Sequence, residues 1–158
     1  MTRDREQWEE HIRRQSDPTA PLPRKTHRAT SQDLEFKIQS GFIDWVRMVE
    51  MGQIPELRLL YAIPSGGNRH PAVGAKMKRE GVVRGVPDLH LPIGRGGYLS
   101  LYLETKTPDP NSKLSKWQIE RIAWLEAEGN LVRVCHAIDE LIDAVVQYLA
   151  LEPTRRSG

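Results

Sequence analysis

GVPDLHLPIGRGGYLSLYLETK, residues 85–106, contains two apolar runs that alternate with period two on either side of a glycine-rich turn. This pattern is typical of a β-hairpin. Residues directly opposite one another in an antiparallel pair point to the same side of the sheet, so the apolar residues of both runs are expected to face each other. The register that achieves this gives three pairs: Ile93 with Leu99, Leu91 with Leu101, and Leu89 with Leu103.

The same register places Asp88 opposite Glu104, and Lys106 points to the same side two residues further on. Two carboxylates about 5 Å apart repel each other, and burial increases the cost. A divalent cation removes that cost, because Mg²⁺ is held by one or two carboxylates together with water and phosphate oxygens. The adjacent lysine could orient or deprotonate a water, or neutralise charge in a transition state. The alternative is that Glu104 and Lys106 are solvated residues on a half-exposed strand.

Four short segments of the chain carry a resemblance to a known family. They are IPSGGNR (63–69), GVVRGVPD (81–88), ETK (104–106) and LSKWQ (114–118). In this order they resemble the VRR-NUC (virus-type replication-repair nuclease) domain of the PD-(D/E)XK nuclease superfamily. The resemblance extends from about residue 34 to about residue 149. The superfamily motif alone is weak, whereas the ordered set of four segments is specific.

The composition is that of one soluble globular domain, with 158 residues, 39% hydrophobic and 28% charged. The net charge of +2 does not itself demand a nucleic-acid partner. A single cysteine excludes an intrachain disulfide and fits a reducing compartment. Neither a membrane span nor a signal-peptide core is evident, so we expect a cytoplasmic protein without membrane contact. We expect a basic N-terminal arm (1–30), a nuclease-like domain (31–151) and a disordered tail (152–158).

The order of the expected elements predicts an α/β sandwich with a mixed sheet of about four strands. This agrees with the restriction-endonuclease-like fold that the resemblance implies. Apolar periodicity, capping residues and prolines set the bounds. Besides the hairpin, we expect a helix from Thr30 or Ser31 to Gly52, an interior strand over 57–63, a basic helix over 71–80, a helix over 115–128 with Trp117, Ile122 and Leu125 buried, a strand over 131–136, and a helix over 138–149.

The resemblance implies roles for particular residues. Asp88 and Glu104 would hold Mg²⁺ or Mn²⁺, with the backbone carbonyl of Thr105, and Lys106 would act on the water. Glu35 matches a first-helix glutamate that supports the metal through water, and Gln118 matches a glutamine beside the active site. Glu35 could instead be an exposed acid and Gln118 a half-exposed polar residue.

Lysine and arginine residues cluster in the segment from Arg69 to Arg84, where the only acidic residue is Glu80. Arginine and lysine side chains suit contacts to the DNA backbone. The alternative is an ordinary loop followed by a solvated helix face. The candidate DNA-binding residues are Arg69, Lys76, Lys78, Arg79 and Arg84.

These features together favour a metal-dependent DNA endonuclease that hydrolyses phosphodiester bonds. The resemblance suggests replication, repair or recombination and a stand-alone, phage-type protein acting on branched or four-way-junction DNA. Alternatives are a non-cleaving nucleic-acid-binding module on the same fold, which has no need of the acid pair, and a structural protein with an accidental acid cluster. A homodimer would match the two-fold symmetry of a junction. Its interface is expected on the first helix, unless these residues pack into the protomer core: Phe42, Trp45, Met48, Val49 and Met51.

Overall fold

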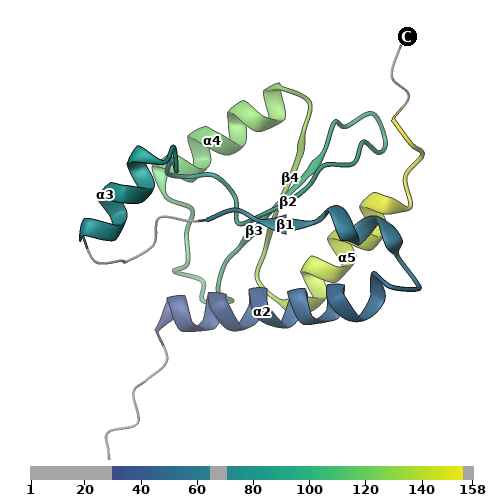
Figure 1. The fold of residues 1–158 in the computed structure, drawn as a ribbon, viewed down its shortest axis with the longest axis horizontal. Helices are drawn as coiled ribbons and strands as arrows, with labels where there is room; N and C mark the ends of the chain where they lie inside the picture. Colours follow the sequence, from purple (N-terminus) through teal and green to yellow (C-terminus); the bar gives the residue numbers. More distant parts are fainter. Residues whose placement is uncertain (1–29, 65–70, 155–158) are drawn as a thin grey trace, which may run out of the picture.

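The computed structural model describes residues 30–64 and 71–154, which form an α/β structure with a central sheet (Figure 1). The expected fold class is therefore confirmed. The elements are α2 (Ser31–Val49), the 3₁₀ helix η1 (Pro55–Leu59), β1 (Tyr61–Ala62), α3 (Pro71–Arg79), β2 (Leu89–Leu91), β3 (Leu101–Thr105), α4 (Lys116–Ala127), β4 (Leu131–Cys135) and α5 (Ile138–Leu149).

The sheet has the strand order β1-β2-β3-β4. The first two pairings are antiparallel, and β4 runs parallel to β3 after a crossover through α4. The predicted register of the hairpin is confirmed where β2 and β3 pair, because Leu89 lies opposite Leu103 and Leu91 lies opposite Leu101.

The predicted pairing of Ile93 with Leu99 is wrong. Leu99 is 61% exposed, and its N–H donates to the carbonyl of Gly129 instead. Pro92 follows the last paired residue of β2, and a proline has no N–H with which to continue the ladder. Beyond it, the bridge between Arg95 and Tyr98 is shifted by one residue from the register of the strands.

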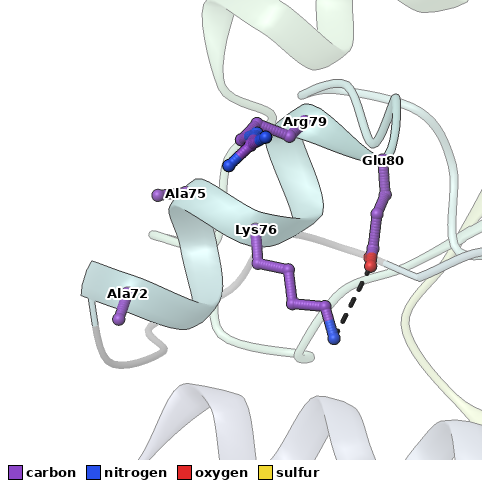
Figure 2. Close-up of a pocket in the computed structure, with 5 residues that line it drawn as sticks. All are labelled: Ala72, Ala75, Lys76, Arg79 and Glu80. Carbon is purple, nitrogen blue, oxygen red and sulfur yellow. Dashed lines mark ion pairs between the residues drawn. The ribbon is translucent and has the colours of Figure 1, made fainter.

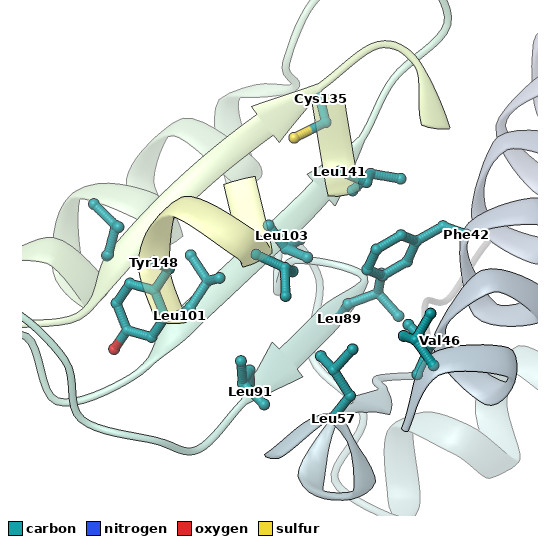
Figure 3. Packing of buried hydrophobic residues seen from close by; sticks show 13 residues of the cluster. Phe42, Val46, Leu57, Leu89, Leu91, Leu101, Leu103, Cys135, Leu141 and Tyr148 are labelled. Carbon is teal, nitrogen blue, oxygen red and sulfur yellow. The ribbon is translucent and has the colours of Figure 1, made fainter. Parts of the chain in front are cut away.

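The core lies between one face of the sheet and helices α2 and α5. Figure 3 shows side chains from α2, β2, β3 and α5 meeting in one cluster, with Phe42, Leu103 and Leu141 among them. Each fully buried leucine stabilises the fold by roughly 1.5–3 kcal/mol relative to an exposed one. Thr30 caps α2 through a reciprocal pair of hydrogen bonds with Asp33, which fixes the start of this helix as the sequence predicts.

The interior strand predicted over 57–63 is not observed. Pro55 begins η1 instead, and only two residues of the segment form β1, at the edge of the sheet and with both residues exposed. Leu57 is the one residue of η1 that reaches the core, at 1% exposed, whereas Leu59 is 54% exposed. The apolar run therefore reflects one anchored turn rather than a strand covered on both faces.

Two further expectations about buried surfaces need correction. Phe42 and Val49 are buried in the core of the protomer and cannot form a dimer interface, whereas Met48 and Met51 are 71% and 84% exposed. On α4, no residue is fully buried: Trp117 is 45% exposed, and Ile122 and Leu125 are only partly buried.

The contacts of the domain extend past the predicted boundary at residue 151. Glu152 accepts a hydrogen bond from the Gly96 N–H, and Thr154 bonds to Gly94 and Gly97 in the hairpin turn. Of the predicted N-terminal arm only Thr30 lies within the described residues, and the rest of the predicted tail lies outside them. No helix of the described segments is long and apolar enough to span a membrane.

Candidate active site

The chain brings Asp88, Glu104 and Lys106 together at the ends of β2 and β3, as the hairpin register predicts. The Lys106 Nζ lies 3.1 Å from the Glu104 Oε1. Asp88 precedes β2, and its Oδ2 accepts a hydrogen bond from the backbone N–H of Thr105 at 2.9 Å. The two acids are thus tied to adjacent strands, and the lysine lies beside them.

Gln118 reaches the same cluster from the first turn of α4. Its Oε1 accepts from the Ser115 N–H at 2.9 Å, which completes the capping box of the helix. Its Nε2 donates to the Glu104 Oε1, which also receives Lys106. The side chain therefore stabilises the helix start and positions the buried carboxylate at once.

Gly85 permits this approach of α4 to the loop before β2. Its φ of 81° lies in the left-handed region, and a Cβ there would lie 2.2 Å from the carbonyl oxygen of Trp117. Only glycine allows the Gly85 backbone and the first turn of α4 to pack this closely. The contact holds Gln118 near the acids.

Glu35 lies on α2 and contacts the lysine of the cluster. The Glu35 Oε1 is 3.7 Å from the Lys106 Nζ, and the Glu35 side chain is 29% exposed. The ammonium group of Lys106 is thus held between Glu35 and Glu104. This placement makes Glu35 a partner of the lysine.

Burial dominates the electrostatics of the acid pair. Glu104 is 1% exposed, and burial together with the nearby Asp88 raises its pKa to about 7, although Lys106 opposes the change. Burial also raises the pKa of Asp88, partly offset by the hydrogen bond from Thr105. Burial alone would lower the pKa of Lys106, but the surrounding carboxylates outweigh it and raise the pKa above its usual value.

The donor set suits a hard divalent cation. The Glu104 Oε2 is buried without a hydrogen-bond partner, so this acceptor is unsatisfied in the protein alone. Within residues 30–64 and 71–154 there is no cluster of three or more His, Cys, Asp or Glu residues that could hold a metal. Two carboxylates are nevertheless the usual protein share of a Mg²⁺ site, whose other ligands are waters and phosphate oxygens.

Among the described residues, no hydrogen bond or ion pair joins the basic residues of the central segment to the cluster of Asp88, Glu104 and Lys106. Lys76, Lys78, Arg79 and Arg84 are exposed, and Lys76 forms a surface ion pair with Glu80 at 3.7 Å. An open hollow of about 600 Å³ beside α3 is lined by Ala72, Ala75, Lys76, Arg79 and Glu80 (Figure 2). Arg69 lies outside the described residues.

Tyr61, His90 and Tyr102 form an aromatic row next to the acids, which the sequence analysis did not predict. The Tyr61 hydroxyl lies 2.7 Å from the His90 Nδ1, and the His90 ring stacks on Tyr102. His90 therefore both packs against an aromatic ring and forms a hydrogen bond. The signal for the row was present, because the register that pairs Asp88 with Glu104 also pairs His90 with Tyr102.

The fold and the site together define a class of protein. A mixed sheet flanked by helices, with two acids and a lysine at the ends of adjacent antiparallel strands, is the arrangement of a nuclease-type domain. The contributions of Glu35 and Gln118 from α2 and α4 fit the same class.

The chain belongs to the VRR-NUC domain family. The family model matches residues 45–139, more than half of the chain. The chain is also similar to a solved structure described as a VRR_NUC domain protein, with 31% sequence identity and a TM-score of 0.64 over 80% of this chain and 93% of the other. No curated protein matches the chain.

Proposed function

We propose that this protein is a Mg²⁺- or Mn²⁺-dependent endonuclease that hydrolyses phosphodiester bonds in DNA. The observation that carries the proposal is the convergence of Asp88, Glu104 and Lys106, with a buried carboxylate oxygen of Glu104 left without a partner. Membership of a nuclease family supports it. A protein that only binds DNA would gain nothing from a buried acid beside a partly buried one, since both repel the phosphate backbone.

In this proposal Asp88, Glu104 and the Thr105 carbonyl hold the metal. When bound, the metal opposes the charge that develops on the phosphate and makes water a better nucleophile. Lys106 donates a hydrogen bond that orients the attacking water, and its charge stabilises the transition state. Its raised pKa keeps it protonated at neutral pH, which favours this role over that of a general base.

Glu35 and Gln118 position these groups. Glu35 forms a second ion pair with the Lys106 ammonium, in addition to that of Glu104, and it has room to support the metal through water because it is partly exposed. Gln118 fixes one oxygen of Glu104, which leaves the other oxygen for the metal. Loss of either residue would misplace a reacting group without removing it.

The exposed basic residues supply contacts to the DNA backbone. Lys78, Arg79 and Arg84 have no ion pair of the kind that joins Lys76 to Glu80 among the described residues. We propose that these four, together with Arg69, bind phosphates on either side of the cut. Such contacts add affinity without adding sequence preference.

We further propose that the protein acts on branched DNA as a homodimer, in replication, repair or recombination. One domain carries one site, whereas two-fold related strands of a four-way junction need two sites with matching symmetry. Met48 and Met51 on and after α2 remain exposed and could contribute to the interface.

The experiment is a cleavage assay on linear duplex, single-stranded, flap and four-way-junction DNA, with Mg²⁺, Mn²⁺ or EDTA. Cleavage should require the metal and disappear in Asp88→Asn and Glu104→Gln, while an exposed-acid variant, Glu120→Gln, should cut like the wild type. A dimer should linearise an extruded cruciform plasmid by paired cuts in one binding event. Metal-independent cutting, or full activity in Glu104→Gln, would reject the proposed chemistry, and a monomeric mass with nicked circles accumulating first would reject the dimer.

A further inference from the structure

The aromatic row beside the acids is built from three neighbouring strands. Tyr61 of β1 lies opposite His90 of β2, and His90 lies opposite Tyr102 of β3, so the three side chains project from one face of the sheet. The His90 and Tyr102 rings stack, with centroids 4.1 Å apart and an angle of 14° between their planes. Tyr61 meets His90 edge to face, at 5.2 Å and 86°.

This row lies on the same face as the proposed catalytic acids and directly beside them. Asp88 is two residues before His90, and Glu104 is two residues after Tyr102. Side chains two residues apart on a strand point the same way and are separated by about 7 Å. A DNA strand with a phosphate at the acids would therefore have a neighbouring nucleotide over the aromatic row.

The row remains accessible at its outer end. The apolar core and helices α2 and α5 lie on the opposite face, and α4, on this side, packs against β4 at the far edge. β1 is the edge strand, and Tyr61 is 50% exposed. Because the Tyr61 ring is nearly perpendicular to the His90 ring, its face is not stacked on its neighbour in the row.

The row suits an uncharged, flat ligand. It is made of aromatic rings and contains no lysine or arginine side chain. A phosphate would gain little here, whereas a nucleobase would gain a stacking surface. Stacking of a base on an aromatic ring is tolerant of sequence, because every base has a flat face.

We propose that Tyr61, His90 and Tyr102 form a stacking platform for an unpaired base of the strand that is cut. A base within a duplex is already stacked and paired, and only a base splayed from its partner can reach an aromatic ring. The inference rests on the proposed function, since DNA must lie at Asp88 and Glu104. It narrows the substrate to DNA with an unpaired nucleotide beside the scissile phosphate.

Binding of 2-aminopurine oligonucleotides tests this platform independently of cleavage. The fluorescent base is placed at the same position of two DNAs of equal sequence, unpaired at a branch in one and fully paired in the other. The protein carries Lys106→Ala so that the DNA stays intact in Mg²⁺. Binding should quench the unpaired probe, because its base stacks on an aromatic ring, and should leave the paired probe unchanged.

Variants of the exposed tyrosine identify the ring as the cause. Tyr61→Leu should abolish the quenching and weaken binding of the unpaired probe by roughly ten-fold, with duplex affinity unchanged. Tyr61→Phe keeps the ring while removing the hydroxyl bond to His90, and should behave as the parent protein. Tyr98→Leu is the matched control, since it makes the same change at an exposed tyrosine in the turn after β2.

Failure of the platform is distinguishable from failure of the proposed function. Tight binding of the unpaired probe without quenching would overturn the platform, and so would an equal loss of affinity for both probes in Tyr61→Leu. If the Lys106→Ala protein quenches the unpaired probe but the wild-type protein cleaves no DNA, the stacking platform is supported and the nuclease function is rejected. Absence of binding to both DNAs would reject both proposals.

Discussion

Glu104→Gln should make the metal-free protein more stable above pH 7 while it abolishes cleavage. The ionised carboxylate of Glu104 is buried beside Asp88, and the ion pair with Lys106 does not fully offset the cost of burying this charge. The pKa of Glu104 therefore rises to about 7. A glutamine at this position resembles the protonated acid and can keep the hydrogen bond with Gln118. The substitution therefore removes an unfavourable charge from the fold.

The pH dependence follows from the direction of the pKa change. The folded wild type holds the proton of the Glu104 carboxyl more tightly than the unfolded chain does. The stability that this tighter proton binding adds is therefore complete below about pH 4.5 and is lost as the pH rises through about 7. The difference of about 2.5 pH units, at 1.36 kcal/mol each, amounts to on the order of 3 kcal/mol. For a domain of this size that corresponds to roughly 10 °C in Tm.

Thermal unfolding in EDTA at several pH values between 5 and 8.5 measures this effect. The Tm of Glu104→Gln should exceed that of the wild type by an amount that grows with pH, whereas Glu120→Gln, at an exposed site on α4, should follow the wild type. Saturating Mg²⁺ should raise the Tm of the wild type and of Glu120→Gln but not that of Glu104→Gln, because the metal binds the ionised site. The reasoning is refuted if Glu104→Gln is the less stable protein at pH 8 in EDTA, or if the difference is flat with pH.

Three further predictions concern single side chains. Lys106→Ala should lower the cleavage rate by about 10²–10³-fold with metal affinity retained in calorimetry, since an electrostatic group is lost from the transition state; full activity would exclude that role. Gln118→Ala should cost about 1 kcal/mol in denaturant unfolding through the lost helix cap and should also reduce cleavage, whereas Ser115→Ala, which removes the cap alone, should retain cleavage once folded. Arg79→Ala should weaken binding to all DNA sequences and reduce the salt dependence of log K by about one; an unchanged salt slope would leave Arg79 without a phosphate contact.

The alternating pattern of one hairpin predicts most of the site. Leu89, Leu91, Leu101 and Leu103 can be buried together in only one register, and a slip by one residue would turn them all to the other face. That constraint fixes the neighbours of the leucines as well. The proximity of the acids to each other and to the lysine is therefore a consequence of burial in the core.

Where burial constrains the chain weakly, the sequence predicts less. The segment around Leu57 is apolar, yet it contributes one buried turn and a two-residue edge strand, because nothing in the run distinguishes burial on both sides from burial of a single side chain. Likewise, Trp117 and Leu99 are apolar but largely exposed. Periodicity identifies which residues share a face, but whether that face is covered depends on packing between distant segments.

The convergence of Glu35 and Gln118 on the acids depends on such packing. Each lies on a helix outside the hairpin, and spacing alone leaves an exposed residue as the alternative. The placement of Gln118 follows from two structural constraints: the capping box that orients Gln118 toward Glu104, and the close approach of α4 to the backbone at Gly85. The capping box can be read from Ser115 and the glutamine three residues later. The approach at Gly85 cannot be read locally, because a glycine before Val86-Pro87 also suits an ordinary turn, so only the folded chain reveals that this glycine holds a helix against the site.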